Sequence, residues 1–137
     1  MADPAFVASS EPGSLPSCAS RRNCACDSPG GTENSLQPIP FRSPIEQVMR
    51  IMKDAISAEP RMRIVVEGRR YLRAEARSAV FRFVDDVELL ADENAGLIHF
   101  RSASRVGLGD LGVNGRRMRR ITMRIRQRLA DLSSPAP

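Results

Sequence analysis

The sequence predicts an α+β domain in which a curved antiparallel sheet of four to five strands is combined with two helices. Three observations support this fold class. Two segments carry apolar residues at helical spacing, four segments between them read as strands, and short turns join those strands in pairs. The predicted order is strand, helix, four strands, helix. This order suits a curved antiparallel sheet that packs around a helix.

The folded domain is expected to span residues 36–133, as a single domain with one core. Residues 1–35 are rich in Ser, Pro, Gly and Ala. Such a segment buries too little apolar surface to offset the entropy lost on ordering it. We therefore predict a disordered tail over residues 1–35, in which "NCACD" is the only unusual feature, and a disordered C-terminus over residues 134–137.

The three cysteines, Cys18, Cys24 and Cys26, all lie in the predicted tail, and the only histidine, His99, lies far along the chain. A zinc site needs about four ligands at recognisable spacing, which this pattern does not offer. An odd number of cysteines also argues against a complete disulfide framework. We predict no metal site, and no cofactor is indicated.

Order is expected to begin with a short strand over residues 36–41. We predict that this strand lies at the edge of the sheet, because its prolines cannot donate ladder hydrogen bonds. A helix follows, with Ser43 as N-cap, Pro44 as first helical residue and Glu46 completing a capping box. Pro60 is expected to end it. Its apolar stripe at helical spacing is Ile45, Val48, Met49, Met52, Ala55 and Ile56.

A first hairpin is predicted around Gly68, between two segments that alternate in polarity. Before the turn, Met62, Ile64 and Val66 fall on one side of the strand. After it, the inward set is Leu72, Ala74 and Ala76.

A second hairpin joins "VFRFVDDVELL" to "LIHFRSAS" across the turn "ADENAG". The assumed register sets Leu90 opposite Leu97 and therefore Asp85 opposite Ser102. A slip of one residue would turn the apolar set to water. On the outer face this register pairs Asp86 with Arg101 and Glu88 with His99, cross-strand pairs rather than catalytic dyads. The predicted core face carries Phe83, Val87, Leu89, Ile98 and Phe100.

The last helix is predicted to start at Asn114, a favourable N-cap. The net charge of +5 is concentrated here, because residues 101–137 hold nine arginines against Asp110 and Asp131. An apolar stripe covers about a third of the circumference, and an arginine face is expected to point to water. The stripe is Met118, Ile121, Thr122, Ile125, Leu129 and Leu132; the outward arginines are Arg116, Arg119, Arg120 and Arg124.

The strand-to-helix junction "FRSASRVGLGDLGVNGRRMRR" is the most polar and most tightly turned part of the sequence. Asp85 should point inward beside it, and a buried carboxylate needs donors. The polar residues of this junction either hold the loop in place or form the polar end of an apolar groove that binds a ligand. The candidate ligand-binding residues are Asp85, Arg101, Ser102, Ser104, Arg105, Asp110, Asn114 and Arg117.

Several short motifs spread along the chain are specific enough to compare with a known family. They are Asn23 and Cys24; Pro38, Ile39 and Phe41; Phe83, Asp85, Asp86, Val87 and Glu88; Ile98, His99, residues 101–105 and Gly107; Asp110, Gly112, Asn114 and Arg117. With these motifs the chain resembles, over roughly residues 22–132, a bacterial and plastid family called domain of unknown function 1499. The resemblance implies no established activity. Many members look exported or membrane-anchored, whereas this chain lacks an apolar N-terminal segment.

Three functions are compatible with these residues. The first is a non-catalytic binding module whose groove, between the sheet and the last helix, ends in the polar cluster and takes an apolar or amphipathic small ligand or a protein segment. The second is nucleic-acid or anionic-surface binding through the last helix, although no aromatic side chain interleaves with its arginines. The third is an enzyme using the polar cluster, but no Ser-His-Asp or Cys-His grouping is visible, so no catalytic residue is assigned. The candidate anion-binding residues are Arg116, Arg119, Arg120, Arg124 and Arg126.

A cytoplasmic location is expected from the N-terminal sequence. It lacks a basic region followed by an apolar one, the pattern of a signal peptide. No stretch has the roughly 18 consecutive apolar residues of a membrane span. A start site further upstream would allow an exported or anchored form.

Overall fold

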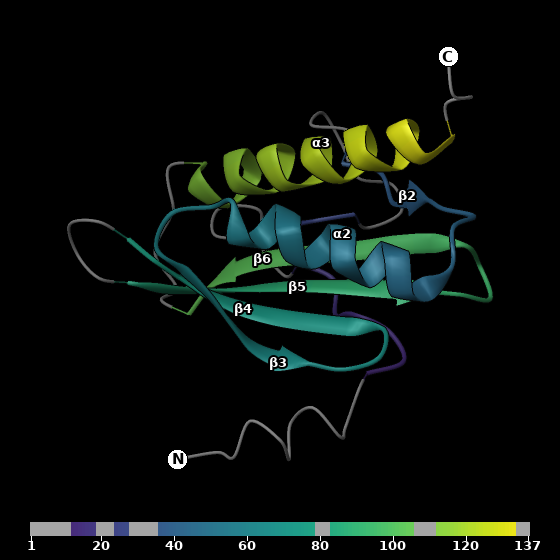
Figure 1. Cartoon of the computed structure of the whole chain (residues 1–137). Coiled ribbons are helices and arrows are strands. Elements are labelled where there is room, and N and C mark those ends of the chain that lie inside the picture. The colour runs from purple at the N-terminus through teal and green to yellow at the C-terminus, as the bar shows by residue number, and fades with distance from the viewer. Residues whose placement is uncertain (1–11, 19–23, 28–35, 79–82, 106–111, 134–137) are drawn as a thin grey trace.

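The computed structural model describes residues 12–18, 24–27, 36–78, 83–105 and 112–133. Its six strands form one antiparallel sheet, and two helices pack against one face of it (Figure 1). The predicted α+β class is confirmed. The elements are β1 (Cys24–Cys26), β2 (Ile39–Pro40), α2 (Ile45–Ser57), β3 (Met62–Glu67), β4 (Tyr71–Arg77), β5 (Val84–Asp92), β6 (Leu97–Ser104) and α3 (Val113–Ser133).

The sheet runs in the order β1-β6-β5-β4-β3, and β2 pairs with β6 beside β1. It therefore has more strands than the four to five predicted, because β1 lies in the segment for which we predicted a disordered tail. There Ala25 reaches the core and Cys18 forms a disulfide with Cys24. These contacts hold β1 in place, although the segment around it has few large apolar residues. The prediction of a disordered tail is therefore corrected at β1.

In the described part of the chain, no helix is both long enough and apolar enough to cross a membrane.

The β5–β6 register differs from the predicted one by two residues. Asp92 pairs with Leu97, and Asp85 therefore lies opposite Ser104. A tight turn sets this register: the Gly96 N–H donates to the Asp92 carbonyl, and the Asp92 carboxylate accepts two N–H bonds within the turn. Because side chains alternate with a period of two, the shift changes the cross-strand pairs but keeps each residue on its predicted face.

An irregularity in β3 moves Val66 to the outer face of the sheet. The β3–β4 register shifts between Ile64 and Val66, so Ile64 packs on the main core while Val66 packs with Tyr71 and Leu90. An extra residue in one strand turns the following side chains over. The prediction that Val66 shares a side with Ile64 is wrong for this reason.

The ends of both helices differ from the sequence prediction. Pro44 is the N-cap of α2 and no side chain caps the helix, so the predicted capping box does not form. The Pro44 carbonyl accepts the first N–H bonds instead. α3 begins at Val113, which makes Asn114 a helical residue with its side chain in the interior.

The main core lies between the inner face of the sheet and the two helices. It includes the whole predicted stripe of α2, with Ile51 in addition, and the apolar stripe of α3 up to Leu129. Leu132 and Phe83 were predicted to be internal, but they are 48% and 45% exposed. Both lie at an element boundary, where the neighbouring elements no longer cover them.

Two glycine-to-alanine substitutions should change stability in opposite directions. Gly96 has φ +67° and an added Cβ would meet the Phe41 carbonyl oxygen at 3.3 Å, so Gly96→Ala should destabilise by about 1 kcal/mol or more. Gly115 lies within α3 with only the flexible Arg119 side chain nearby. Gly115→Ala should therefore stabilise by about 0.5–1 kcal/mol. Denaturant unfolding measures both, and equal signs would contradict these backbone assignments.

Candidate functional site

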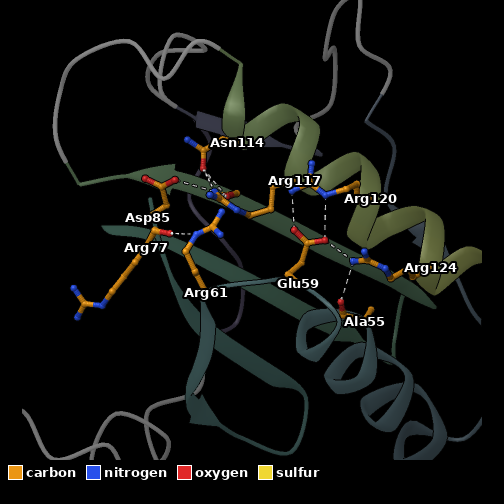
Figure 2. Close-up of polar contacts among 10 residues, drawn as sticks. Ala55, Glu59, Arg61, Arg77, Asp85, Asn114, Arg117, Arg120 and Arg124 are labelled. Atoms are coloured by element: carbon orange, nitrogen blue, oxygen red, sulfur yellow. Dashed lines mark hydrogen bonds and ion pairs between the residues drawn. The ribbon is translucent and has the colours of Figure 1, made fainter. Parts of the chain in front are cut away.

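A buried polar cluster, here called the junction cluster, joins β5, β6 and α3. It consists of Asp85, Ser102, Ser104, Asn114 and Arg117. The Arg117 Nη1 donates to Asp85 Oδ2 at 2.9 Å, to Ser102 Oγ at 3.1 Å and to Asn114 Oδ1 at 2.9 Å (Figure 2). The Ser102 hydroxyl donates to Asn114 Oδ1 at 2.6 Å, and Asn114 Nδ2 donates to Ser104 Oγ at 2.9 Å.

The secondary structure explains how these groups meet. Asp85 and Ser104 are partners in the β5–β6 ladder and point to the helix side of the sheet. Asn114 and Arg117 are three residues apart in the first turn of α3, so they share a helix face. The buried carboxylate is thus matched with a buried guanidinium, and the cluster's hydrogen bonds are made within the protein.

The predicted ligand-binding residues are only partly gathered in this cluster. Arg101 and Arg105 lie on the outer face of the sheet, where Arg101 donates to Glu88 and Arg105 to Asp86 and Glu75. Their positions follow from strand alternation, because the inward residues of β6 are Ser102 and Ser104. Asp110 lies outside the described residues.

A second buried charge, Glu59, was not predicted as a site residue. It lies just after α2, with a side chain only 2% exposed. Both carboxylate oxygens accept hydrogen bonds from α3: Arg120 binds through Nε at 3.1 Å and Nη2 at 2.8 Å, and Arg124 binds through Nη1 (Figure 2). Burial raises the pKa of Glu59, but hydrogen bonds from Arg120 and Arg124 outweigh burial and leave the pKa below its usual value.

The lowered pKa of Glu59 predicts a pH-dependent contribution to stability. A depressed carboxyl pKa stabilises the folded state above the unfolded-state pKa, and this contribution is lost as pH falls through the folded pKa. The difference in unfolding free energy between the wild type and Glu59→Gln should therefore be constant near neutral pH and shrink below about pH 4.5. Denaturant titrations from pH 7 to pH 3 measure it, and a difference that grows on acidification would contradict the assignment.

These contacts change the predicted role of the arginine face. Arg120 and Arg124 bind Glu59 at the end of α2, although their side chains stay 49% and 35% exposed, and Arg126 Nη2 donates to the Gln37 carbonyl at 2.9 Å. Arg116 and Arg119 are exposed. At least three of the five predicted anion-binding arginines are thus already engaged by acceptors within the chain.

The outer face of the sheet carries a network of ion pairs. Asp86 binds Arg73 at 3.0 Å and Arg105 at 2.8 Å, and the Tyr71 hydroxyl donates to Glu88 at 2.6 Å. Burial raises the pKa of Asp86, but hydrogen bonds from Arg105 and the charges of both arginines lower it overall. Burial, followed by the bond to Glu88, raises the pKa of Tyr71.

His99 is on this face but does not pair with Glu88 as predicted. Its Nδ1 lies 2.8 Å from Asp27 Oδ2, and Asp27 Oδ1 accepts the Phe100 N–H at 2.7 Å. The Asp27 N–H also donates to the Phe100 carbonyl. Sequence reasoning missed this pair because Asp27 belongs to "NCACD", which was assigned to the tail, and 72 residues separate the partners.

A hollow of about 530 Å³ lies beside α3, between that helix and the segment before β2. Its wall is mainly apolar, and Arg119 and Arg126 are among the residues that line it. None of the five residues of the junction cluster lines this hollow. The lining residues are Leu36, Gln37, Phe100, Arg119, Thr122, Met123, Arg126, Gln127 and Ala130.

Comparison with known proteins identifies a family but no activity. A family model described as "Protein of unknown function (DUF1499)" matches residues 14–125. No curated protein matches the chain. The matched range begins before β1 and ends within α3, and it contains both buried charge clusters.

Proposed function

The chain belongs to the DUF1499 family, and we propose that it is a non-catalytic binding module for an amphipathic anion, held in the hollow beside α3. The occupant to which we commit is an aliphatic chain with a carboxylate or phosphate head. The observation that supports this proposal is the composition of the hollow, in which apolar side chains and two arginines line the same space.

The apolar wall fits the tail of such a ligand. Leu36 and Ala130 line the hollow, together with the buried Phe100 and with Met123, a residue that is 69% exposed. A large apolar side chain exposed at a concave surface gains from being covered, at about 25 cal/mol per Å² of apolar area removed from water. Methionine is also flexible enough to adapt to an apolar chain.

The two arginines fit an anionic head group. Arg119 is exposed, and Arg126 is exposed while one of its nitrogens holds the Gln37 carbonyl. The planar guanidinium binds carboxylate and phosphate through two parallel hydrogen bonds. Charge at one position and apolar surface beside it favour an amphipathic ligand over a neutral one.

The lining favours binding over catalysis. Among the described residues that line it, none has a carboxylate, imidazole or thiol that could transfer a proton or attack a substrate. The one hydroxyl in it, that of Thr122, donates to the Met118 carbonyl at 2.7 Å within α3. The hollow thus offers shape, apolar surface and positive charge.

The alternatives receive less support from the geometry. An enzyme at the junction cluster would need an available acid or base, whereas Asp85 is neutralised by Arg117. Nucleic-acid binding would need the helix arginines together on an open surface, whereas Arg120 and Arg124 hold Glu59. Binding of an anionic polymer with a steep salt dependence remains the outcome that would favour this second function.

Calorimetric titration with dodecanoate below its micelle-forming concentration tests the proposal. Dodecanoate should bind, and dodecanol and acetate should each bind more weakly because each lacks half of the recognised chemistry. Met123→Asp should abolish binding, and Arg119→Gln with Arg126→Gln should weaken it about tenfold, the effect of roughly 1.4 kcal/mol. Arg128→Gln is the matched control, since Arg128 is on α3 but pairs with Asp54 outside this hollow. Binding that Met123→Asp leaves unchanged would place the ligand elsewhere.

A further inference from the structure

We propose that Cys26 is a reactive thiol that exchanges with the Cys18–Cys24 disulfide beside it, with His99 as its base and Asp27 as the residue that positions His99. This centre lies on the outer face of the sheet, away from the hollow beside α3, and does not depend on the function proposed there. Among the described residues, Cys26 is the one free cysteine.

The strand pairing places the thiol and the disulfide on one face. Cys24 and Cys26 are partners of Ala103 and Arg101 in the β1–β6 ladder. Residues two apart in a strand point to the same side, so the free sulfur and the disulfide lie on the same side of β1. Ala25, between them, points to the core.

A small hollow of about 220 Å³ brings residues of this centre to one space. Cys26, Asp27 and His99 line it together with residues 13–17. Ser17 immediately precedes Cys18, so the chain that carries the other half of the disulfide forms part of the same wall.

Asp27 fixes how His99 can act. Its carboxylate lies 2.8 Å from His99 Nδ1 and is itself held by the Phe100 N–H at 2.7 Å. A carboxylate at Nδ1 favours the proton on that nitrogen and leaves Nε2 as the basic site. An imidazole held in this way is the base that commonly activates a cysteine.

The residue paired with Cys26 has a buried donor without an acceptor. Arg101 Nε is the one buried side-chain nitrogen or oxygen among the described residues without a hydrogen-bond partner, and Arg101 lies directly opposite Cys26. A thiolate would supply an acceptor and a charge partner. The other charged groups around the centre are Glu88, bound to Arg101 at 3.3 Å, and Asp92, which lines the hollow.

The exchange conserves atoms and electrons. His99 takes the Cys26 proton, and the thiolate attacks the Cys18 sulfur. The Cys18–Cys24 bond breaks, a Cys18–Cys26 bond forms, and the electron pair leaves on the Cys24 sulfur, which takes the proton from the imidazolium. One disulfide and one thiol are present before and after, so no external oxidant or reductant is consumed.

The rate of Cys26 alkylation at a fixed pH of 7 tests the activation. Iodoacetamide labelling of the full oxidised chain, followed by intact mass, should be severalfold faster in the native protein than in denaturant. His99→Gln should slow the native rate, and so should Asp27→Asn, which keeps an oxygen for the Phe100 N–H. Glu93→Gln, in the exposed turn, should leave it unchanged. Should either variant fold poorly, wild type in denaturant gives the same comparison, because unfolding separates Cys26 from His99.

Disulfide mapping tests the exchange itself. Native protein is held at pH 8, quenched with acid, alkylated and digested. Both the Cys18–Cys24 and the Cys18–Cys26 forms should be recovered, and their interconversion should be severalfold slower in His99→Gln under the same conditions. Recovery of Cys18–Cys24 alone, or an alkylation rate that His99→Gln does not change, would overturn the proposal.

Discussion

Replacing Arg120 and Arg124 together with glutamine is expected to destabilise the protein by about 3–5 kcal/mol. Glu59 is almost fully buried, and these two arginines are the cations that bind its carboxylate. Without them the charge stays buried and uncompensated, or the carboxyl group must take up a proton. Denaturant unfolding at pH 7 measures the loss, and part of it should be recovered at acidic pH.

The matched control removes two other arginines from the same helix. Arg119→Gln with Arg128→Gln changes the net charge equally, but Arg119 is exposed and Arg128 pairs with a half-exposed Asp54. Exposed pairs contribute at most about 1 kcal/mol, so this variant should stay close to the wild type. Equal losses in the two double variants would show that net charge, rather than the contact with Glu59, determines stability.

Replacing Arg117 with methionine should cost about 3–5 kcal/mol, because it leaves the buried Asp85 carboxylate without its cation. Asp85→Asn should cost less, about 1–3 kcal/mol, since an amide keeps some hydrogen bonds. The double variant Asp85→Asn with Arg117→Met should be more stable than the sum of the two losses predicts, because the charge and its partner are removed together.

This series distinguishes an architectural junction from a ligand site. If the cluster holds β5, β6 and α3 together, each single change lowers the free energy of unfolding. A site arranged for a ligand stores unsatisfied or repelling groups, so that Asp85→Asn would be neutral or stabilising. A stabilised Asp85→Asn variant would therefore return the junction cluster to consideration as the functional site.

Much of the fold could be predicted because hydrophobic periodicity is a local signal. The stripe of α2 and the inward position of Asp85 follow from spacing alone, and both are found. The two-residue register error left the faces intact for the same reason. The bulge that turns Val66 outward has no such signal, because it depends on how β3 fits β4.

The candidate site was only partly predictable because its contacts join distant segments. The grouping of Asp85 with Asn114 and Arg117 was expected from burial and the need for donors. The partners of Glu59 and Asp27 lie 61 and 72 residues further along the chain, and no spacing rule connects them. Arg120 and Arg124, predicted from helical periodicity to face water, are thus partly exposed ion-pair partners of a buried carboxylate.

Backbone amide chemical shifts of the full chain, followed during titration with dodecanoate, test most directly whether the hollow beside α3 is the binding site. The proposal predicts saturable shifts at Leu36, Met123 and Ala130, with Asp85, Asn114 and Arg117 little changed. Shifts centred on the junction cluster, or none at a ligand concentration that saturates other amphipathic-anion binders, would contradict it.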